Sequence, residues 1–206
     1  SLAPRYPSAI YSDCPDLSAQ SIAIGMGCGI SEQLYNTIKA LLKEYCGTLL
    51  IDADGLNALA RYGIDILSAE RNCRVILTPH VKEFSRLTGR AVGEIVRDPV
   101  NSAKQFAKQY NVTVLLKGAA SVITDGARVA LNVNGNTALS KGGSGDMLSG
   151  YLCGTLARGV PPFEACVCSA YVLGHAAEIA AEDKTEYCAT ARDIIKNLHF
   201  SVKRLT

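Results

Sequence analysis

Short apolar runs alternate with longer amphipathic stretches through the first half of the chain. Four runs of strand length occupy residues 21–24, 48–51, 74–77 and 112–116. Between them, apolar residues recur every three or four positions, which predicts helices over about 32–45 and 99–110 and a short helix after Asp54. Strands that alternate with helices predict an α/β fold, a mainly parallel sheet covered by helices on both faces.

The second half of the chain carries a different pattern. Two short runs at residues 122–124 and 128–132, joined by Asp125-Gly126, predict a β-hairpin. The remaining predicted elements are helices that end at about residue 158, span about 163–182 and span about 191–199, the last preceded by the capping residue Thr190. We therefore expect one domain over residues 1–206 with a helical C-terminal tail.

Composition and charge limit the classes of partner. The 206 residues carry a formal net charge of +2 and are 48% hydrophobic, with no block of like charges. Neither nucleic acid nor a membrane surface is therefore an expected partner. No apolar run reaches membrane-spanning length. We expect small-molecule ligands and a cytoplasmic protein.

Eight cysteines raise the question of disulfides. They form no metal-type C-x-x-C pair, and those inside apolar runs are Cys46, Cys73, Cys153, Cys166 and Cys168. In a chain of this length we expect buried, reduced thiols and a reducing compartment. Residues 1–20 contain three prolines and no apolar core, which predicts a loop and neither a signal peptide nor a membrane anchor.

A glycine-rich stretch carries the strongest chemical signal. Gly142, Gly143 and Gly145 directly precede a segment with helical spacing. The first amides of a helix have no partner within the helix, and the aligned peptide dipoles concentrate positive charge at the same point. The stretch therefore predicts an anion site, with phosphate as the preferred anion.

Asp146 follows these glycines directly. A carboxylate among phosphate-binding amides would repel the ligand unless it had a separate task, and a base that takes a proton from a substrate hydroxyl fits that task. The alternative is that Asp146 caps the helix and the glycines form a turn. Three glycines within four residues favour catalysis, because glycine clusters mark close backbone approach to a ligand.

Polar residues also follow the other predicted strands, at the sheet edge where α/β proteins bind ligands. The four segments, in chain order, are Gly-x-Gly-x-Gly at 25–29, Asp-Ala-Asp-Gly-Leu-Asn at 52–57, Thr-Pro-His at 78–80 and Lys-Gly at 117–118. Asp54 is either a ligand-binding carboxylate or a helix cap. His80 either contacts a ligand or is structural, and no third ligand accompanies His80 and Glu83 to make a metal site. Lys117 either reaches a phosphate or is solvated.

Taken in order, these loops resemble one family. The Gly-x-Gly-x-Gly, Asp-Ala-Asp-Gly-Leu-Asn, Thr-Pro-His-x-x-Glu-Phe, Leu-Lys-Gly-Ala and Lys-Gly-Gly-Ser-Gly-Asp motifs extend from about residue 21 to 198. This series resembles the ADP/ATP-dependent NAD(P)H-hydrate dehydratases of the ribokinase-like superfamily. The resemblance implies a ribokinase-like fold.

The resemblance also implies roles for individual residues. Asp146 is the implied catalytic residue and contacts the hydrated nicotinamide ring, and Gly27 and His80 are further implied substrate contacts. The implied nucleotide-binding residues are Lys117, Gly118, Ala119, Ala120, Ser121, Asn136, Gly142, Gly143, Ser144 and Gly145.

The implied reaction repairs NADH or NADPH that has gained water across the ring. Because hydroxide is a poor leaving group, ADP or ATP with Mg²⁺ phosphorylates the ring hydroxyl, and phosphate then leaves. The resemblance further implies a homo-oligomer. The family's first strand, helix and glycine-rich loop have no counterpart before residue 21, so we expect the C-terminal part of a longer protein, with an epimerase for the same damaged cofactor in the full-length chain.

Two alternatives stay open at the level of sequence. A small-molecule kinase of the same superfamily, acting on a vitamin precursor, would keep Asp146 and the anion loop but lack the Thr-Pro-His pattern. A non-catalytic nucleotide-binding module would account for the missing N-terminal elements, although such a module has no need of a base at residue 146.

Overall fold

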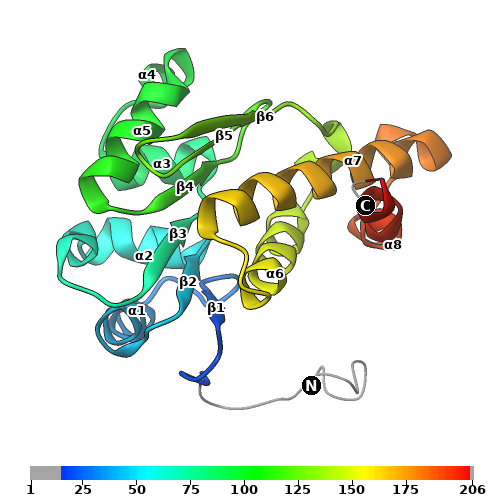
Figure 1. Ribbon diagram of the computed structural model, residues 1–206. Helices are drawn as coiled ribbons and strands as arrows, with labels where there is room; N and C mark the ends of the chain where they lie inside the picture. The colour runs from blue at the N-terminus through cyan, green and yellow to red at the C-terminus, as the bar shows by residue number, and fades with distance from the viewer. Residues whose placement is uncertain (1–14, 205–206) are drawn as a thin grey trace.

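The computed structural model describes residues 15–204, so most of the loop expected over residues 1–20 lies outside the described residues. Figure 1 shows one sheet between two layers of helices. The strands are β1 (Ser21–Ile24), β2 (Thr48–Ile51), β3 (Arg74–Leu77), β4 (Thr113–Leu116), β5 (Ser121–Thr124) and β6 (Val129–Asn132). The helices are α1 (Glu32–Glu44), α2 (Asp54–Tyr62), α3 (Val81–Thr88), α4 (Val92–Arg97), α5 (Pro99–Tyr110), α6 (Ser144–Ala157), α7 (Pro162–Cys188) and α8 (Ala191–Lys203), with short 3₁₀ turns η1 (Ile64–Ser68) and η2 (Thr137–Ser140).

The six strands lie side by side in chain order, β1 to β6. Strands β1 to β4 are parallel, with Ile24 opposite Ile51 and Ile51 opposite Leu77. Strands β5 and β6 continue the sheet in antiparallel pairing, with Ile123 opposite both Leu115 and Ala130. The predicted mainly parallel sheet and the predicted hairpin are therefore both confirmed.

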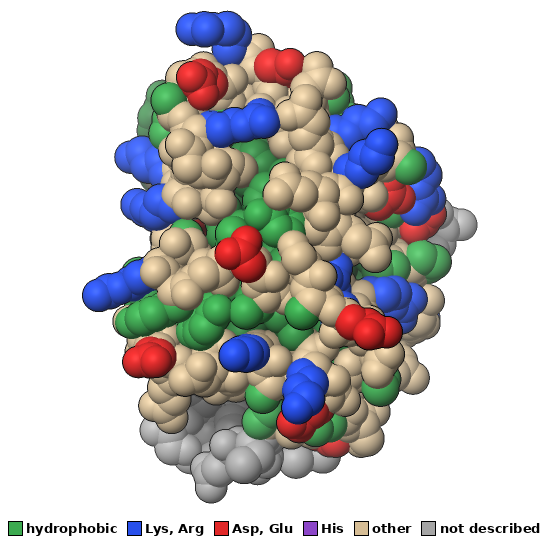
Figure 2. Space-filling view, turned by 90° about the vertical axis from the view of Figure 1, so that its left-hand side faces the viewer, with side chains coloured by type: hydrophobic (Ala, Val, Ile, Leu, Met, Phe, Trp, Pro, Cys, Tyr) green, Lys and Arg blue, Asp and Glu red, His purple; other side chains and the backbone are tan. Residues whose placement is uncertain are grey.

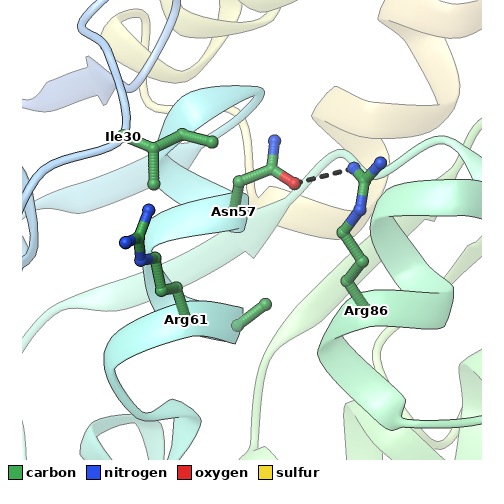
Figure 3. A pocket seen from close by; sticks show the side chains of 5 residues that line it. Ile30, Asn57, Arg61 and Arg86 are labelled. Carbon is green, nitrogen blue, oxygen red and sulfur yellow. Dashed lines mark hydrogen bonds between the residues drawn. The ribbon is translucent and has the colours of Figure 1, made fainter.

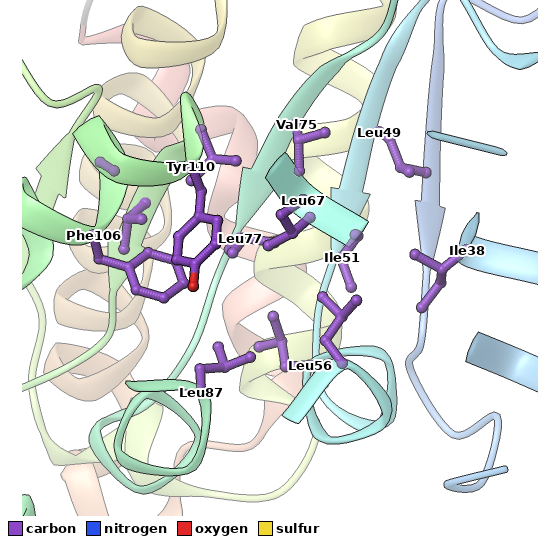
Figure 4. Packing of buried hydrophobic residues seen from close by; sticks show 14 of the residues in the cluster. Ile38, Leu49, Ile51, Leu56, Leu67, Val75, Leu77, Leu87, Phe106 and Tyr110 are labelled. Carbon is purple, nitrogen blue, oxygen red and sulfur yellow. The ribbon is translucent and has the colours of Figure 1, made fainter. Parts of the chain in front are cut away.

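The alternation of side chains along each strand divides the core in two. In β2, Leu49 and Ile51 face the layer of α1 to α5, whereas Leu50 faces α6 to α8. Figure 4 shows the first core, in which Ile38 of α1 and Leu56 of α2 pack on the sheet. Because the parallel strands are buried on both faces, they read as continuous apolar runs without period-two alternation.

Local capping explains where several helices begin. The Leu34 amide donates to Oγ of Ser31 at the start of α1, and Thr190 caps α8 as predicted. Helix α7 reaches Cys188 only across a kink at Thr185, where φ is +64°, so its regular part ends close to the predicted residue 182. Helix α8 is longer than predicted. Periodicity did not predict α4, η1 or η2, because each spans too few residues to show a repeat.

All described cysteines are free thiols, but not all are buried. Burial raises the pKa of both the Cys73 and the Cys166 thiol. The expectation of burial was wrong for Cys46 and Cys168, which are exposed. Cys46 lies just beyond the end of α1, and Cys168 lies on a solvent-facing position of α7.

One face of the molecule shows how the charged side chains are distributed. Figure 2 views the side of the molecule that carries α1 to α5, where basic and acidic side chains are interspersed among apolar ones. Charges of both signs are therefore mixed on this face. Among the described helices, none combines the length and apolar character needed to span a membrane.

Two glycines bring the loops after β1 and β2 into contact at the carboxyl end of the sheet. Gly25 has a φ of +114°, and a Cβ there would lie 2.1 Å from the carbonyl oxygen of Asp52. A Cβ at Gly55 would lie 3.3 Å from Cα of Gly25. The loop after β1 can therefore reach the start of α2 only with glycine at residue 25.

We predict that Gly25→Ala lowers the free energy of unfolding by more than about 3 kcal/mol, because a Cβ would meet backbone in a left-handed conformation. The measurement is urea unfolding followed by circular dichroism. The matched control is Gly29→Ala, where φ is also positive but no atom lies within 4 Å of the added Cβ. We expect that control to cost only about 1 kcal/mol. Equal losses in the two variants would contradict the close-contact explanation.

Candidate active site

A cavity of about 830 Å³ lies where the parallel strands end. Its walls come from the segments after β2, β3 and β4, from the β6–α6 connection, and from α6 and α7. The predicted site residues that line it are His80, Lys117, Gly118, Ala119, Ser121, Asn136, Ser144, Gly145 and Asp146. The structure thus brings together most of the residues that the sequence singled out.

Four predicted site residues do not line this cavity. Ala120, Gly142 and Gly143 lie beside lining residues in the same loops. Gly27 lies in the loop after β1, with a φ of +67° and no atom within 4 Å of the position that a Cβ would take. The backbone at Gly27 is therefore open to a ligand from outside the cavity.

Asp146 does not cap helix α6. Gly143 occupies the cap position in the left-handed conformation, and no side chain makes the capping hydrogen bond. Asp146 lies in the first turn and is exposed, and its carboxylate makes no hydrogen bond with any other described side chain or backbone group. The alternative interpretation as a cap is therefore wrong, and the carboxylate is available to a ligand.

The start of α6 also offers hydrogen-bond donors. Within the described chain, the backbone amides of Gly145 and Asp146 have no partner. The Ser144 hydroxyl is buried and likewise has no partner among the described residues. Together with the helix dipole, these donors are suited to an anion, and the anion site stays a prediction.

Lys117 is held over the cavity by a buried carboxylate. Its Nζ donates to Oδ1 of Asp52 at 3.0 Å, and the side chain of Asp52 is only 2% exposed. The Ala53 amide also donates to Oδ1, and Oγ of Ser149 in α6 donates to Oδ2, both at 2.8 Å. A Cβ at Gly145 would lie 3.5 Å from Lys117 Nζ, so the ammonium lies beside the start of α6.

His80 begins helix α3 and is fixed by its own capping box. The amides of Lys82 and Glu83 donate to Nδ1 of His80 at 3.0 and 3.1 Å, and the His80 amide donates to Oε2 of Glu83 at 2.8 Å. Because Nδ1 accepts, the neutral ring carries its proton on Nε2, which lies 3.4 Å from Oε1 of Glu83. The ring is therefore held in one orientation at the cavity edge.

The backbone joins His80 to Lys117 as well. The Lys117 amide donates to the carbonyl of Pro79 at 2.8 Å, and His80 and Lys117 form an isolated parallel bridge. The ends of β3 and β4 are thus locked together beyond the regular sheet.

Helix α7 holds the loop that carries Asn136. The Gly135 amide donates to Oε1 of Glu178 at 2.8 Å, and the hydroxyl and amide of Thr137 donate to Oε2 of Glu186 at 2.5 and 3.0 Å. These two donations from Thr137 keep the pKa of the Glu186 carboxyl below its usual value. Asn136 itself donates to the Ala177 carbonyl and accepts the Ala138 amide, so its side chain shapes the loop.

Asp54 has a third role that neither sequence alternative included. The Gly29 amide donates to Oδ2 of Asp54 at 2.8 Å, so Asp54 holds the glycine loop after β1. The cap position of α2 belongs to Ala53, which has a φ of +50° and makes no side-chain cap. Asp54 does not line the cavity.

Sequence reasoning missed several lining residues. Asp52 stood in the motif at 52–57, but no local signal separated it from Asp54. Glu83 carried a signal as a capping-box partner three residues after His80. Ala170 and Leu173 of α7 reach the cavity only through the packing of α7 on the sheet.

Comparisons of the sequence with known proteins show which family this chain resembles. A sequence profile described as NAD(P)H-hydrate dehydratase matches residues 7–199. A bifunctional NAD(P)H-hydrate repair enzyme from Hyperthermus butylicus is 37% identical over 186 residues, covering 86% of this chain and 33% of the relative. The chain thus spans about a third of the length of the first curated relatives that it matches.

Solved structures give the same result. An ADP/ATP-dependent NAD(P)H-hydrate dehydratase from Bacillus subtilis, co-crystallised with ATP and Mg²⁺, superimposes with a TM-score of 0.89 at 30% identity, covering 100% of this chain and 77% of that one. A ribokinase-like superfamily protein from Enterococcus faecalis, with 20% identity, a TM-score of 0.70 and coverage of 91% of this chain and 64% of that one, confirms the ribokinase-like fold. The chain therefore belongs to the NAD(P)H-hydrate dehydratase family.

Proposed function

We propose that this chain carries out the nucleotide-dependent dehydration of hydrated NADH or NADPH, with ADP or ATP as phosphoryl donor. The observation that carries the proposal is the exposed carboxylate of Asp146, which lines the cavity in the first turn of α6, among amides without partners. A base and an anion site in one place suit transfer of a phosphoryl group to a hydroxyl.

The residues divide the reaction into two steps. Asp146 takes the proton of the ring hydroxyl while the hydroxyl oxygen attacks the terminal phosphorus of ADP or ATP. The phosphoanhydride bond breaks, and AMP or ADP leaves. The carbon–oxygen bond then breaks, inorganic phosphate leaves, and the neighbouring ring carbon loses a proton to restore the double bond. The α6 amides and Lys117 stabilise the charge on the transferred group, and His80 and Gly27 contact the dinucleotide.

The cavity suits a nucleotide-bound Mg²⁺ better than a resident metal. Among the described residues, no three His, Cys, Asp or Glu side chains form a metal-binding group. Mg²⁺ normally keeps several waters and binds through one or two carboxylates and the substrate phosphates. Of the three carboxylates that line the cavity, those of Asp52 and Glu83 are bonded to Lys117 and His80, whereas that of Asp146 has no partner among the described residues and fits such an ion. The ion would neutralise phosphate charge.

The relatives of this chain are longer proteins, which bears on what the full-length protein contains. The name of the Hyperthermus relative describes a bifunctional repair enzyme, and this chain spans 33% of it. We therefore propose that the 206 residues are a ribokinase-like dehydratase domain and that the full-length protein carries an epimerase for the same hydrate. The reduced thiols support a cytoplasmic protein.

Replacing the base tests the proposed function. We expect Asp146→Asn to lower the rate of dehydration by a factor of about 10³, because the hydroxyl proton loses its acceptor. The measurement is the rise in reduced-nicotinamide absorbance when the protein is mixed with NADH hydrate, Mg²⁺ and either ADP or ATP. Glu94→Gln, a surface carboxylate of α4, is the matched control. Nucleotide binding without any rise in absorbance in the wild-type protein would contradict the proposed reaction.

Lys117 is expected to serve both folding and nucleotide binding. We predict that Lys117→Gln leaves Asp52 buried without its counter-charge and lowers the free energy of unfolding by about 3 kcal/mol. The double variant with Asp52→Asn should recover much of this stability, because no buried charge remains. We expect both variants to bind ADP about tenfold more weakly, since Lys117 lies beside the anion site. Calorimetry measures both quantities, and recovered ADP affinity in the double variant would show that Lys117 acts through folding alone.

We also propose that the chain forms a homo-oligomer through β6. This edge strand exposes Leu131 by 57%, and Val133, just beyond it, by 72%. Leu131→Lys should shift the mass measured by light scattering to that of the monomer. Val96→Lys, at a 60% exposed position of α4, is the control and should leave the mass unchanged. A monomeric wild-type protein would refute this assembly.

A further inference from the structure

A second hollow, which we call the arginine groove, lies beside the active-site cavity. It has a volume of about 540 Å³ and is lined by Ile30, Asn57, Ala60, Arg61 and Arg86. Figure 3 shows Asn57 and Arg61 on α2, Arg86 on α3 and Ile30 on the loop after β1. None of these residues lines the active-site cavity.

The groove carries positive charge that the described residues do not neutralise. Neither Arg61 nor Arg86 forms an ion pair with a carboxylate of the described chain. Arg86 is nevertheless oriented, because its Nη1 donates to Oδ1 of Asn57 at 2.9 Å. Arg61 lies over the ring of Tyr62, 5.5 Å from its centroid. Two oriented guanidiniums without a carboxylate partner are suited to bind a phosphate.

The groove continues the cavity along the same two helices. Ala53 and Glu83 line the cavity, whereas Asn57 and Arg86 line the groove four and three residues further on. The lining residues of the two sites are therefore about one helical turn, roughly 5 Å, apart along these segments. Nδ2 of Asn57 donates to the carbonyl of Ala53 at 3.0 Å, so one side chain connects the cavity wall to Arg86.

We infer that the arginine groove binds a phosphate of the ADP-ribose half of the dinucleotide substrate, and this inference rests on the proposed function. A substrate whose reacting ring lies near Asp146 must extend its other half beyond the cavity, which the phosphoryl donor also occupies. The cations of α2 and α3 without an ion pair in the described chain are Arg61, Lys82 and Arg86, and of these Arg61 and Arg86 line the groove. Ile30 and Ala60 add apolar surface for a ribose or a base.

The phosphate has two possible sources within the substrate, the pyrophosphate and the 2′-phosphate of NADPH hydrate. Kinetics with both hydrates distinguishes them. We expect Arg61→Gln and Arg86→Gln each to raise KM about tenfold with little change in kcat, because they bind a part of the substrate that does not react. An equal rise for both hydrates identifies the pyrophosphate, and a rise confined to NADPH hydrate identifies the 2′-phosphate. Arg90→Gln, which removes a neighbouring arginine hydrogen-bonded to Gln105, is the control.

Direct binding separates this inference from the proposed activity. The probes are ADP-ribose and its 2′-phosphorylated form, titrated by calorimetry in the presence of saturating ADP. The inference holds if the two variants weaken binding of at least one probe about tenfold and Arg90→Gln does not. It holds even if the wild-type protein dehydrates neither hydrate, a result that would refute only the proposed function. Wild-type KM values and probe affinities in both groove variants would overturn it.

Discussion

The candidate site depends on the buried ion pair between Asp52 and Lys117. A carboxylate this deeply buried is costly unless its oxygens are compensated, and here Lys117, the Ala53 amide and the Ser149 hydroxyl all donate to it. These donors belong to the ends of β4 and β2 and to α6. The interaction that compensates the charge therefore also fixes three elements around the cavity.

A second group of contacts holds the anion loop from the side of α7. A Cβ at Gly174 would lie 2.5 Å from the carbonyl of Asn134, so the loop backbone rests directly on the helix. Lys141 donates to three carbonyls at the end of α7, those of Glu186, Tyr187 and Ala189. A loop tied down in this way presents its amides without reorganisation, which is what stabilisation of phosphoryl charge requires.

The positively charged side chains at the active-site cavity and at the arginine groove differ in whether a carboxylate pairs with them. Lys117 is paired with a buried carboxylate, so its position is set by the fold. Arg61 and Arg86 have no carboxylate partner in the described chain, so their charge is available to an incoming anion. The paired ammonium of Lys117 is held in a fixed position, whereas the unpaired guanidiniums of Arg61 and Arg86 attract an incoming anion. Lys117 would then act at the reaction centre, and Arg61 and Arg86 would recognise the substrate.

The sequence by itself determined the α/β class, the succession of strands and helices along the chain, and the glycine-rich loop before α6. These features are local: apolar runs, the repeat of a helix and glycines before a helix each lie within a few neighbouring residues. The sequence did not predict the short helix α4, because one or two turns carry too weak a repeat. It also did not predict the kinked last turn of α7 or the last turn of α8, because helix ends depend on packing.

Only the tertiary structure decided which polar groups meet. Lys117 and Asp52 are 65 residues apart, Thr137 and Glu186 are 49 apart, and Gly29 and Asp54 are 25 apart. The choice between Asp52 and Asp54 shows the reason. Both follow the same strand, but one side chain points beneath Lys117 and the other toward the loop after β1, and that direction is set by the backbone at the strand's end and by partners far along the chain. A local pattern holds no information about such partners.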